Sequence, residues 1–387
     1  MTAFADQIVA AVRQVAGPAP AALHEPVFAG REVEYLTECI ETGWVSSVGR
    51  FVDQFEQRLA EYTGARHAIA VINGTAALHA ALLAVGVDAG SEVLVPALTF
   101  IGTINPVVYC GATPHFIESS PDTLGVDPDA LDQYLRDIAV IKDGVCFNRL
   151  TGARISALLP VHIFGHPIDM DALGDVARRF ALPVVEDAAE AIGSYDKERR
   201  HAGTLGSVGT LSFNGNKTIT TGGGGAILTN DTVLAGRIKH LSTTARVAHR
   251  WQFLHDMVGY NYRLPNINAA LGCAQLEQLD GFIARKRRLT ELYAAAFENV
   301  QGLRLIREPK GTRSNYWLQS IMLDPEKATE RDAVLEALND AGYAARPVWR
   351  LMSTMPMFAC CSRMPLETTE DIERRVISLP SGAGLIP

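Results

Sequence analysis

The feature that most constrains the fold is a regular alternation of short apolar runs with segments of helical spacing. The apolar runs, which we expect to be strands, span residues 68–72, 92–96, 113–117, 156–162 and 183–186. Helical segments lie between them, at residues 76–85, 127–135 and 170–180. Strands that are apolar along their whole length and alternate with helices are typical of a largely parallel sheet covered on both faces. The sequence therefore predicts an α/β fold in this part of the chain.

The pattern changes after Leu241, where two long helical stretches are followed by short alternating elements. The helical stretches span residues 265–279 and 282–297, and the later elements are strands at 304–306, 317–323 and 344–347 with a helix at 331–341. This α+β arrangement predicts a second, smaller domain. We expect a large domain over residues 1–250, with an N-terminal helical segment at 1–22, and a small C-terminal domain over residues 251–387.

Composition and charge exclude several classes of protein. The 387 residues are 48% hydrophobic and carry a net charge of −8 with no long basic run, so neither nucleic acid nor an anionic membrane surface is an expected partner. The sequence has no run of about 18 apolar residues and no signal-peptide pattern, which predicts no membrane span. Its six cysteines form no C-x-x-C pair. We therefore expect no metal site, no disulfide framework and a cytoplasmic location.

Several residues gather at the carboxyl ends of predicted strands, where ligands bind in sheets of this kind. They are Gly74, Thr75, Phe100, His162 and Asp187. The segment Asn73-Gly74-Thr75 stands between a strand and a helix, so its backbone N–H groups and the Thr75 hydroxyl form an anion site in principle. A plain helix N-cap explains the same segment, and both interpretations stay open at this point.

The stretch from Gly209 to Thr229 holds one lysine, Lys217, between short apolar runs and just before the four glycines Gly222 to Gly225. A lysine without charged neighbours in the sequence, near permissive backbone, is suited to a pocket where desolvation makes it a usable amine. A surface lysine in a hairpin is the alternative interpretation. A nucleotide-binding P-loop does not fit, because Asn216 stands between the glycine and the lysine.

Two further nucleotide or hydrolase motifs are also excluded. The spacing of Gly203, Gly206 and Gly209 does not match the glycine pattern of a dinucleotide site. The sequence contains no G-x-S-x-G motif, which argues against an α/β-hydrolase.

Pyridoxal phosphate chemistry requires a different set of residues, and the sequence can supply each part. The cofactor needs a lysine for the covalent link, a carboxylate for the ring nitrogen, an aromatic plate over the ring and a cup of N–H and hydroxyl groups for the phosphate. The candidates are Lys217, Asp187, Phe100, and Gly74-Thr75 with Ser212. Glu186 and Asp187 are adjacent in a strand, so they point to opposite faces and only one can reach the ring.

Assembled in this way, the sequence resembles the DegT/DnrJ/StrS family of nucleotide-sugar aminotransferases from about Glu25 to the C-terminus. The resemblance is carried by Gly43 to Phe55 (GWVSSVGRFVDQF), Asn73 to Leu78 (NGTAAL), Pro96 to Phe100 (PALTF), Pro160 to His162, Glu186 to Ala189 (EDAA), Ser212-Phe213 with Lys217, and Gly259 to Arg263 (GYNYR). The segments SFNGNK and GWVSSVG are most similar to those of the branch associated with legionaminic acid and N-acetylbacillosamine synthesis.

The resemblance implies a fold-type-I pyridoxal phosphate enzyme, with a mostly parallel seven-stranded sheet in the large domain. It implies that Lys217 carries the cofactor, that Asp187 pairs with the ring nitrogen and that Phe100 stacks on the ring. It also implies a homodimer with shared active sites, in which Gly74, Thr75 and Ser212 hold the phosphate and Asn261 reaches it from the other subunit. Many members have Gln or His where this chain has Glu190, close to the cofactor hydroxyl, so the role of this carboxylate is an open question.

The implied reaction moves the amino group of L-glutamate to the C4 keto carbon of a nucleotide-linked 4-keto-6-deoxy sugar. We expect a UDP-linked 2-acetamido sugar used for a bacterial surface glycan or a nonulosonic acid, with Trp44 and Ser46 among the substrate contacts. Amination at C3, sugar dehydration and a regulatory protein that binds the cofactor without catalysis are the alternatives. Dehydratase relatives have histidine at the lysine position, so Lys217 argues against dehydration.

Overall fold

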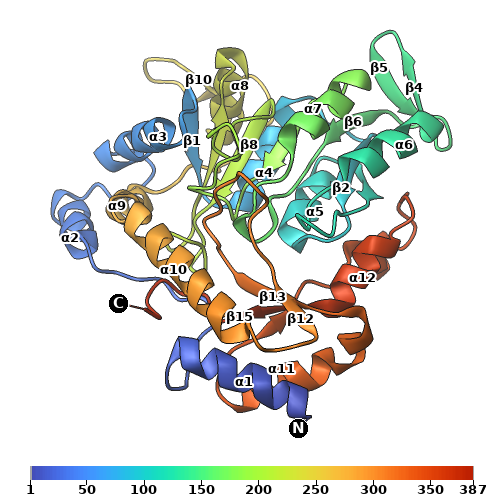
Figure 1. Cartoon of the computed structure of the whole chain (residues 1–387). Helices are drawn as coiled ribbons and strands as arrows, with labels where there is room; N and C mark the ends of the chain where they lie inside the picture. Colours follow the sequence, from blue (N-terminus) through green and yellow to red (C-terminus); the bar gives the residue numbers. More distant parts are fainter. Residues whose placement is uncertain (1, 387) are drawn as a thin grey trace.

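The computed structural model describes residues 2–386, and its largest element is a mixed sheet in the first two thirds of the chain (Figure 1). A three-stranded part has the order β3-β2-β6 and a four-stranded part the order β1-β9-β8-β7. Parallel bridges between Leu158 and Val184 and between Val161 and Asp187 join the two parts. The strands are β1 (His67–Val71), β2 (Glu92–Pro96), β3 (Thr113–Ile117), β6 (Ile155–Leu158), β7 (Val185–Asp187), β8 (Val208–Ser212) and β9 (Gly225–Thr229).

Strand direction in this sheet is mostly parallel. β2 pairs in parallel with β3 and β6, and β7 pairs in parallel with β8, whereas β9 is antiparallel to both β1 and β8. The carboxyl ends of β1, β2, β6, β7 and β8 therefore meet at one edge, and the first residue of β9 lies at the same edge. The mostly parallel seven-stranded sheet expected from the sequence is confirmed.

Helices cover both faces of this sheet because its strands are apolar on both sides. In β1, Ile69 and Val71 contribute to the core that contains α4 and α8, while Ala68 and Ala70 contribute to the core that contains α3 and α9. The helices of this part are α2 (Glu32–Thr42), α3 (Arg50–Thr63), α4 (Gly74–Ala84), α5 (Ile101–Tyr109), α6 (Pro128–Ile138), α7 (Met170–Arg179), α8 (Thr232–Ser242) and α9 (Asn266–Leu276).

A second, smaller sheet lies in the C-terminal part of the chain, with the order β12-β13-β15-β14 and antiparallel pairing throughout. Its apolar side chains form a separate core with residues of α1, α10 and α11. The elements are α1 (Ala3–Ala16), α10 (Leu279–Phe297), β12 (Leu303–Leu305), β13 (Gln319–Leu323), α11 (Arg331–Asp340), β14 (Arg346–Pro347), α12 (Glu367–Arg375) and β15 (Val376–Leu379).

The position of α1 differs from the expected division of the chain. Residues 1–22 were expected in the large domain, but α1 packs on α10 and α11, so we propose that this helix belongs to the C-terminal unit (Figure 1). Conversely, α9 packs against α2 and α3 in the first unit. A domain boundary near residue 250 therefore stays a prediction, and amphipathic spacing alone did not tell which core α1 would cover.

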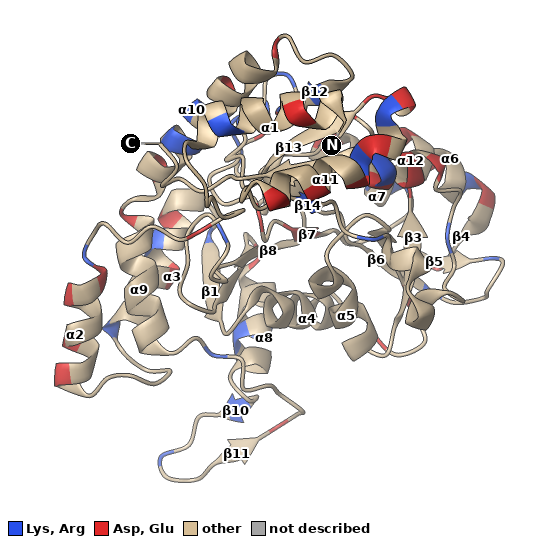
Figure 2. Cartoon of the chain, turned by 90° about the horizontal axis from the view of Figure 1, so that it is seen from below, with Lys and Arg blue, Asp and Glu red and all other residues tan. Residues whose placement is uncertain are grey.

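Two hairpins interrupt the regular alternation and were not predicted. One consists of β4 (Ala139–Lys142) and β5 (Val145–Asn148), and the other of β10 (Arg246–Val247) and β11 (Leu254–His255). The β10–β11 hairpin projects away from the body of the molecule (Figure 2). Among residues 2–386, no helix has both the length and the apolar character that crossing a membrane requires.

Candidate active site

A cavity of about 340 Å³ opens at the edge where the carboxyl ends of the strands meet. Most of the residues predicted for the cofactor line it, namely Gly74, Thr75, Phe100, Asp187, Glu190, Ser212 and Lys217. They come from the ends of β1, β2, β7 and β8 and from the loops that follow. The parallel sheet therefore brings together residues that are up to 143 positions apart in the sequence, from Gly74 to Lys217.

The N-terminus of α4 forms one wall of this cavity. Asn73 caps the helix, since its Oδ1 accepts a hydrogen bond from the Ala76 N–H at 2.7 Å. A Cβ added at Gly74 would lie 2.9 Å from the Cβ of Ser212, and one added at Gly225 would lie 2.6 Å from the carbonyl carbon of Asn73. Glycine is therefore needed at both positions for α4, β8 and β9 to approach so closely. The result is a neutral cradle of helix N–H groups with nearby hydroxyls, a suitable place for an anion.

Asp187 is buried at the end of β7, with only 4% of its surface exposed. Its Oδ2 accepts a hydrogen bond from Thr103 Oγ1 at 2.7 Å, and its Oδ1 accepts one from the Ala189 N–H at 3.0 Å. Burial raises the pKa of Asp187, while these hydrogen bonds and the charge of Lys217 oppose the rise. The carboxylate is thus held by neutral donors and would gain from a cationic partner in the cavity.

The adjacent Glu186 points away from the cavity, as the alternation of a strand requires. Its carboxylate accepts hydrogen bonds from the N–H groups of Gly203 and Leu205, at 2.8 and 2.6 Å, and from that of Gly206. His162 Nε2 lies 3.0 Å from the same carboxylate.

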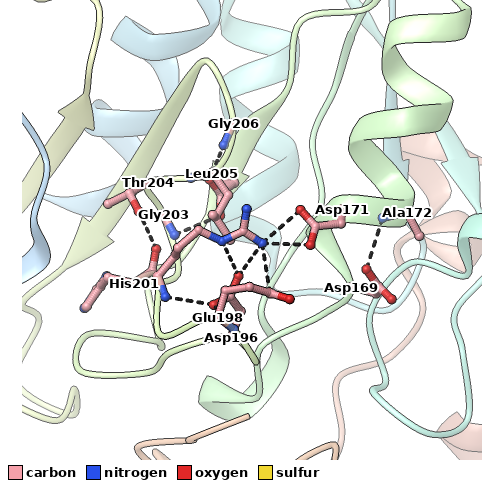
Figure 3. Close-up of polar contacts among 12 residues, drawn as sticks. Asp169, Asp171, Ala172, Asp196, Glu198, His201, Gly203, Thr204, Leu205 and Gly206 are labelled. Carbon is pink, nitrogen blue, oxygen red and sulfur yellow. Dashed lines mark hydrogen bonds and ion pairs between the residues drawn. The ribbon is translucent and has the colours of Figure 1, made fainter. Parts of the chain in front are cut away.

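Figure 3 shows this loop, Gly203 to Gly206, beside the acidic side chains of Asp171, Asp196 and Glu198, which pair with Arg200. Of these two adjacent carboxylates, Glu186 therefore anchors a loop, whereas Asp187 faces the cavity.

Lys217 lies in the connection between β8 and β9, with 13% of its side chain exposed. Its Nζ is 3.3 Å from Oε1 of Glu190 and 4.0 Å from the centre of the Trp317 ring. The lysine has no charged neighbour in the sequence, but the fold places next to it the carboxylate of Glu190, which stands 27 residues earlier in the chain. It is a cavity residue rather than the surface lysine of the alternative interpretation.

Aromatic side chains form another part of the cavity wall. Phe100 stands at the start of α5 and is 54% exposed towards the cavity mouth. The Trp349 ring lies 6.3 Å from Phe100 and 5.4 Å from Phe164, and Phe164 lies 6.4 Å from Trp317. Trp317 and Trp349 both belong to the C-terminal unit, so the cavity is closed by residues of both parts of the chain.

Sequence reasoning missed Thr103, Trp317 and Trp349 as site residues. Thr103 had a usable signal, since it follows Phe100 by three positions and so shares the first turn of the helix after β2. The two tryptophans had none, because nothing in their local sequence indicates that the C-terminal unit reaches the edge of the large sheet.

Three predicted site residues lie outside the cavity of the single chain. Asn261 is exposed and forms a backbone bridge to Thr243 at the base of the β10–β11 hairpin. Trp44 is 57% exposed, and its carbonyl accepts a hydrogen bond from Asn266 Nδ2 at 2.7 Å. Ser46 is exposed, and its carbonyl accepts from the Asn266 N–H at 2.6 Å. Their roles with cofactor and substrate stay predictions.

The chain is similar to a well-populated group of enzymes. Residues 27–387 match the model of the DegT/DnrJ/EryC1/StrS aminotransferase family. GDP-perosamine synthase of Escherichia coli O157:H7 is 39% identical over 361 residues, which cover 93% of this chain and 92% of that one. GDP-perosamine synthase of Caulobacter vibrioides is also 39% identical, with the same two coverages over 362 residues.

A solved structure agrees with this assignment. The structure of DesI in the presence of its TDP-sugar product superposes with a TM-score of 0.83 at 29% identity, covering 96% of this chain and 92% of that one. The relatives named above do not carry the names of the legionaminic acid or bacillosamine branch, which the segments SFNGNK and GWVSSVG had suggested. The chain belongs to the DegT/DnrJ/EryC1/StrS aminotransferase family, which has the fold-type-I architecture and uses pyridoxal phosphate as its cofactor.

Proposed function

We propose that the protein transfers the amino group of L-glutamate to the C4 keto carbon of a nucleotide-linked 4-keto-6-deoxy sugar. The observation that carries the proposal is the convergence of Lys217, Asp187 and the α4 cradle on one cavity, in a chain of this aminotransferase family. The product would supply an amino sugar for a surface polysaccharide.

The residues of the cavity fit the cofactor. The neutral cradle of Gly74, Thr75 and Ser212 suits a phosphate, and Phe100 at the cavity mouth suits the face of a ring. Asp187 is a buried carboxylate whose hydrogen bonds come from neutral donors, so a protonated ring nitrogen would be its charged partner. When bound, pyridoxal phosphate supplies an electron sink that makes the carbon next to the amino group acidic.

Lys217 is the residue that we expect to move protons in this reaction. Its Nζ is the amine that faces the cavity from the β8–β9 connection, and its side chain is short of full burial, so it can reach a bound substrate. As a free amine, Nζ accepts a proton, and as an ammonium it returns one. The tryptophan ring and the carboxylate beside it hold Nζ near one position.

The names of the relatives change our proposal for the nucleotide of the acceptor sugar. UDP was expected from the sequence, whereas the two relatives at 39% identity are named for a GDP-linked sugar. The coverage of more than nine tenths in both chains supports a similar substrate pocket. We therefore propose a GDP-linked 4-keto-6-deoxy hexose as the acceptor, with UDP- and TDP-linked sugars as the competing candidates.

The test is an assay of the purified protein with L-glutamate and a panel of GDP-, UDP- and TDP-linked 4-keto-6-deoxy sugars. We expect 2-oxoglutarate and an aminated sugar, identified by mass, with the highest kcat/KM for the GDP-linked acceptor. Conversion of a UDP-linked 2-acetamido sugar at a higher kcat/KM would restore the original expectation. An absence of 2-oxoglutarate with every sugar would contradict the proposed reaction.

The proposal includes a homodimer in which Asn261 completes the partner subunit's phosphate cradle. Exposed apolar side chains support such an assembly, since large ones gather on the hairpin that carries Asn261 at its base and near residues 44–48. Among them are Trp251, Phe253 and Val258 at 70%, 75% and 79% exposure, and Trp44 and Val48. Patches of this kind mark protein interfaces.

Subunit mixing tests the shared site. Lys217→Ala and Asn261→Ala proteins, each nearly inactive alone, would form mixed dimers with one intact site each. Equal amounts should recover about one quarter of the wild-type activity, since half of the dimers are mixed. Recovery below one twentieth, with mixed dimers proven by tags, would show that Asn261 serves the site of its own subunit.

A further inference from the structure

Glu190 occupies a place in the cavity that the proposed reaction has not yet used. Its side chain is 6% exposed, and the residue, three positions after Asp187, lines the same cavity as the residues predicted for the cofactor. One carboxylate oxygen, Oε1, is 3.3 Å from Nζ of Lys217. The other, Oε2, accepts a hydrogen bond from the Phe164 N–H at 2.9 Å. Glu190 therefore touches the reactive amine and is held by a second element.

The backbone around Glu190 is built to keep it there. Phe164 has a left-handed conformation with φ of 56°, which is costly for an aromatic residue and aims its N–H at the carboxylate. The carbonyl of Glu190 accepts a hydrogen bond from Asn315 Nδ2 at 2.8 Å. Asn315 comes from the C-terminal unit and holds the backbone of Glu190, while Phe164 and Lys217 hold its carboxylate, so three separate parts of the chain contact this residue.

The charges around Glu190 are few. Lys217 faces it from the β8–β9 connection and Asp187 from the end of β7, while the groups from the other neighbouring elements, Phe164 and Asn315, are neutral. His24, on the segment before α2, is near enough to Lys217 for burial and the charges of Lys286 and Lys217 to lower its pKa, which favours a neutral ring. Burial and the charge of Asp187 raise the pKa of Glu190 to about 7, and Lys217 opposes the rise. The carboxyl can thus exist in both forms near neutral pH.

We infer that Glu190 is the proton-exchange partner of Lys217, an assignment that rests on the proposed function. The Lys217 ammonium gives one proton from Nζ to Oε1 of Glu190, so that one N–H bond breaks and one O–H bond forms without any change in electron count. The neutral amine is then ready to accept the substrate proton, and the Glu190 carboxylic acid returns its proton to Nζ later. A glutamine at this position would keep the shape of the side chain and the Phe164 hydrogen bond, but it could not take the proton.

Competitive labelling of lysines tests the exchange without any substrate. The full-length protein, freed of cofactor, is acetylated with a trace of acetic anhydride between pH 6 and 11, and the label on the Lys217 peptide is measured by mass. Only the neutral amine reacts, and the carboxylate next to it favours the ammonium. In Glu190→Gln, we expect half-maximal labelling of Lys217 at a pH about 1 unit lower than in the wild type.

Glu56→Gln is the matched control, because it breaks the ion pair with Lys239 on the surface and leaves the cavity intact. It should leave the labelling curve of Lys217 unchanged. Glu190→Asp, which keeps a shorter carboxylate, should give an intermediate curve. Thermal denaturation of each variant checks that it is folded.

Infrared spectroscopy of the holoenzyme provides the second readout. A band of a protonated carboxylic acid should appear in the wild type as the pH falls through about 7 and should be absent in Glu190→Gln. Unchanged Lys217 labelling in Glu190→Gln, or a carboxylic acid band that persists in it, would overturn the inference even if the sugar panel is aminated as proposed. A shifted labelling curve without turnover of any sugar would sustain the exchange and contradict the proposed function.

Discussion

Two lysines of this protein with little exposed surface, Lys217 and Lys286, have opposite surroundings. Lys217 reaches a cavity and has a carboxylate and a tryptophan ring as neighbours. Lys286 is fully buried on α10, and its Nζ donates to the carbonyl oxygens of Trp317 and Ser381 at 3.0 and 2.5 Å. Burial lowers the pKa of Lys286 to about 7. Burial and a lowered pKa alone would therefore select Lys286 as the reactive amine, whereas access to the cavity selects Lys217.

Trp317 connects the two lysines. Its carbonyl accepts from Lys286, its ring lies over Nζ of Lys217, and its indole N–H donates to the carbonyl of Asn216 at 2.7 Å. Lys286 thus fixes the backbone of Trp317, whose ring covers Lys217. The comparison shows that a lysine without a neighbouring carboxylate can serve as a structural tie in this fold. Lys217, the amine of the proposed reaction, has both a carboxylate and a cavity beside it.

The largest expected effect comes from Lys217→Ala. Turnover with glutamate should fall about 10³-fold or more, because in the proposed reaction the amine is both covalent anchor and proton carrier. Initial rates of 2-oxoglutarate formation measure the loss. Lys239→Ala, which removes a surface lysine paired with Glu56, is the control and should retain wild-type rates. A Lys217→Ala protein with more than a tenth of wild-type activity would end the distinction between the two lysines.

Asp187→Asn should have the next largest effect. The variant keeps the size of the side chain: its Oδ1 can still accept from the Ala189 N–H, and its Nδ2 can donate to Thr103 Oγ1. It loses the negative charge that would pair with a cationic ring in the cavity. We expect kcat/KM for glutamate to fall about 10²-fold. Steady-state kinetics and cofactor titration separate lost catalysis from lost binding. A wild-type kcat/KM in Asp187→Asn would show that the charge of Asp187 does not contribute to the reaction.

Lys286→Met should change how stability depends on pH. The pKa of Lys286 is about 7 in the folded chain and 10.5 in an ordinary exposed lysine, so the unfolded chain binds more protons between these pH values. The free energy of unfolding of the wild type should therefore rise relative to that of the variant from pH 7 to about 10, on the order of 1.4 kcal/mol per pH unit. Urea unfolding at several pH values measures the difference. Parallel curves would mean that Lys286 does not titrate in this range.

Trp317→Phe should have the smallest effect. The ring above Lys217 is retained, but the hydrogen bond to Asn216 is lost, which costs about 1 kcal/mol and corresponds to a several-fold change. We expect kcat/KM to fall about fivefold while the cofactor stays bound. A loss as large as that of Lys217→Ala would instead make Trp317 essential to the chemistry.

The parts of the site that could be predicted from the sequence are those attached to strand ends. Gly74, Phe100 and Asp187 follow apolar runs directly, so the general behaviour of parallel sheets places them at one edge. Strand and helix positions were also predictable, with β2 and β3 found at the expected residues. Each of these features is local, because it depends on a few neighbouring residues.

What could not be predicted depends on contacts between distant segments. The pairing of Glu190 with Lys217 arises when the segments after β7 and β8 meet at the edge of the sheet. Trp317 and Trp349 approach the same cavity only when the C-terminal unit packs against the large sheet. The same holds for α1, whose amphipathic pattern is compatible with either core. The complete burial of Lys286 could not be predicted either, since the residue stands in a charged stretch of α10, ARKRR.

The most direct test of the account is to find which lysine carries the cofactor. The purified protein is incubated with pyridoxal phosphate and reduced with borohydride, and the modified peptide is identified by mass spectrometry. The account predicts the reduced cofactor on Lys217 in stoichiometric amount, and on no peptide in Lys217→Ala. Modification of Lys286, or of another lysine in place of Lys217, would contradict it.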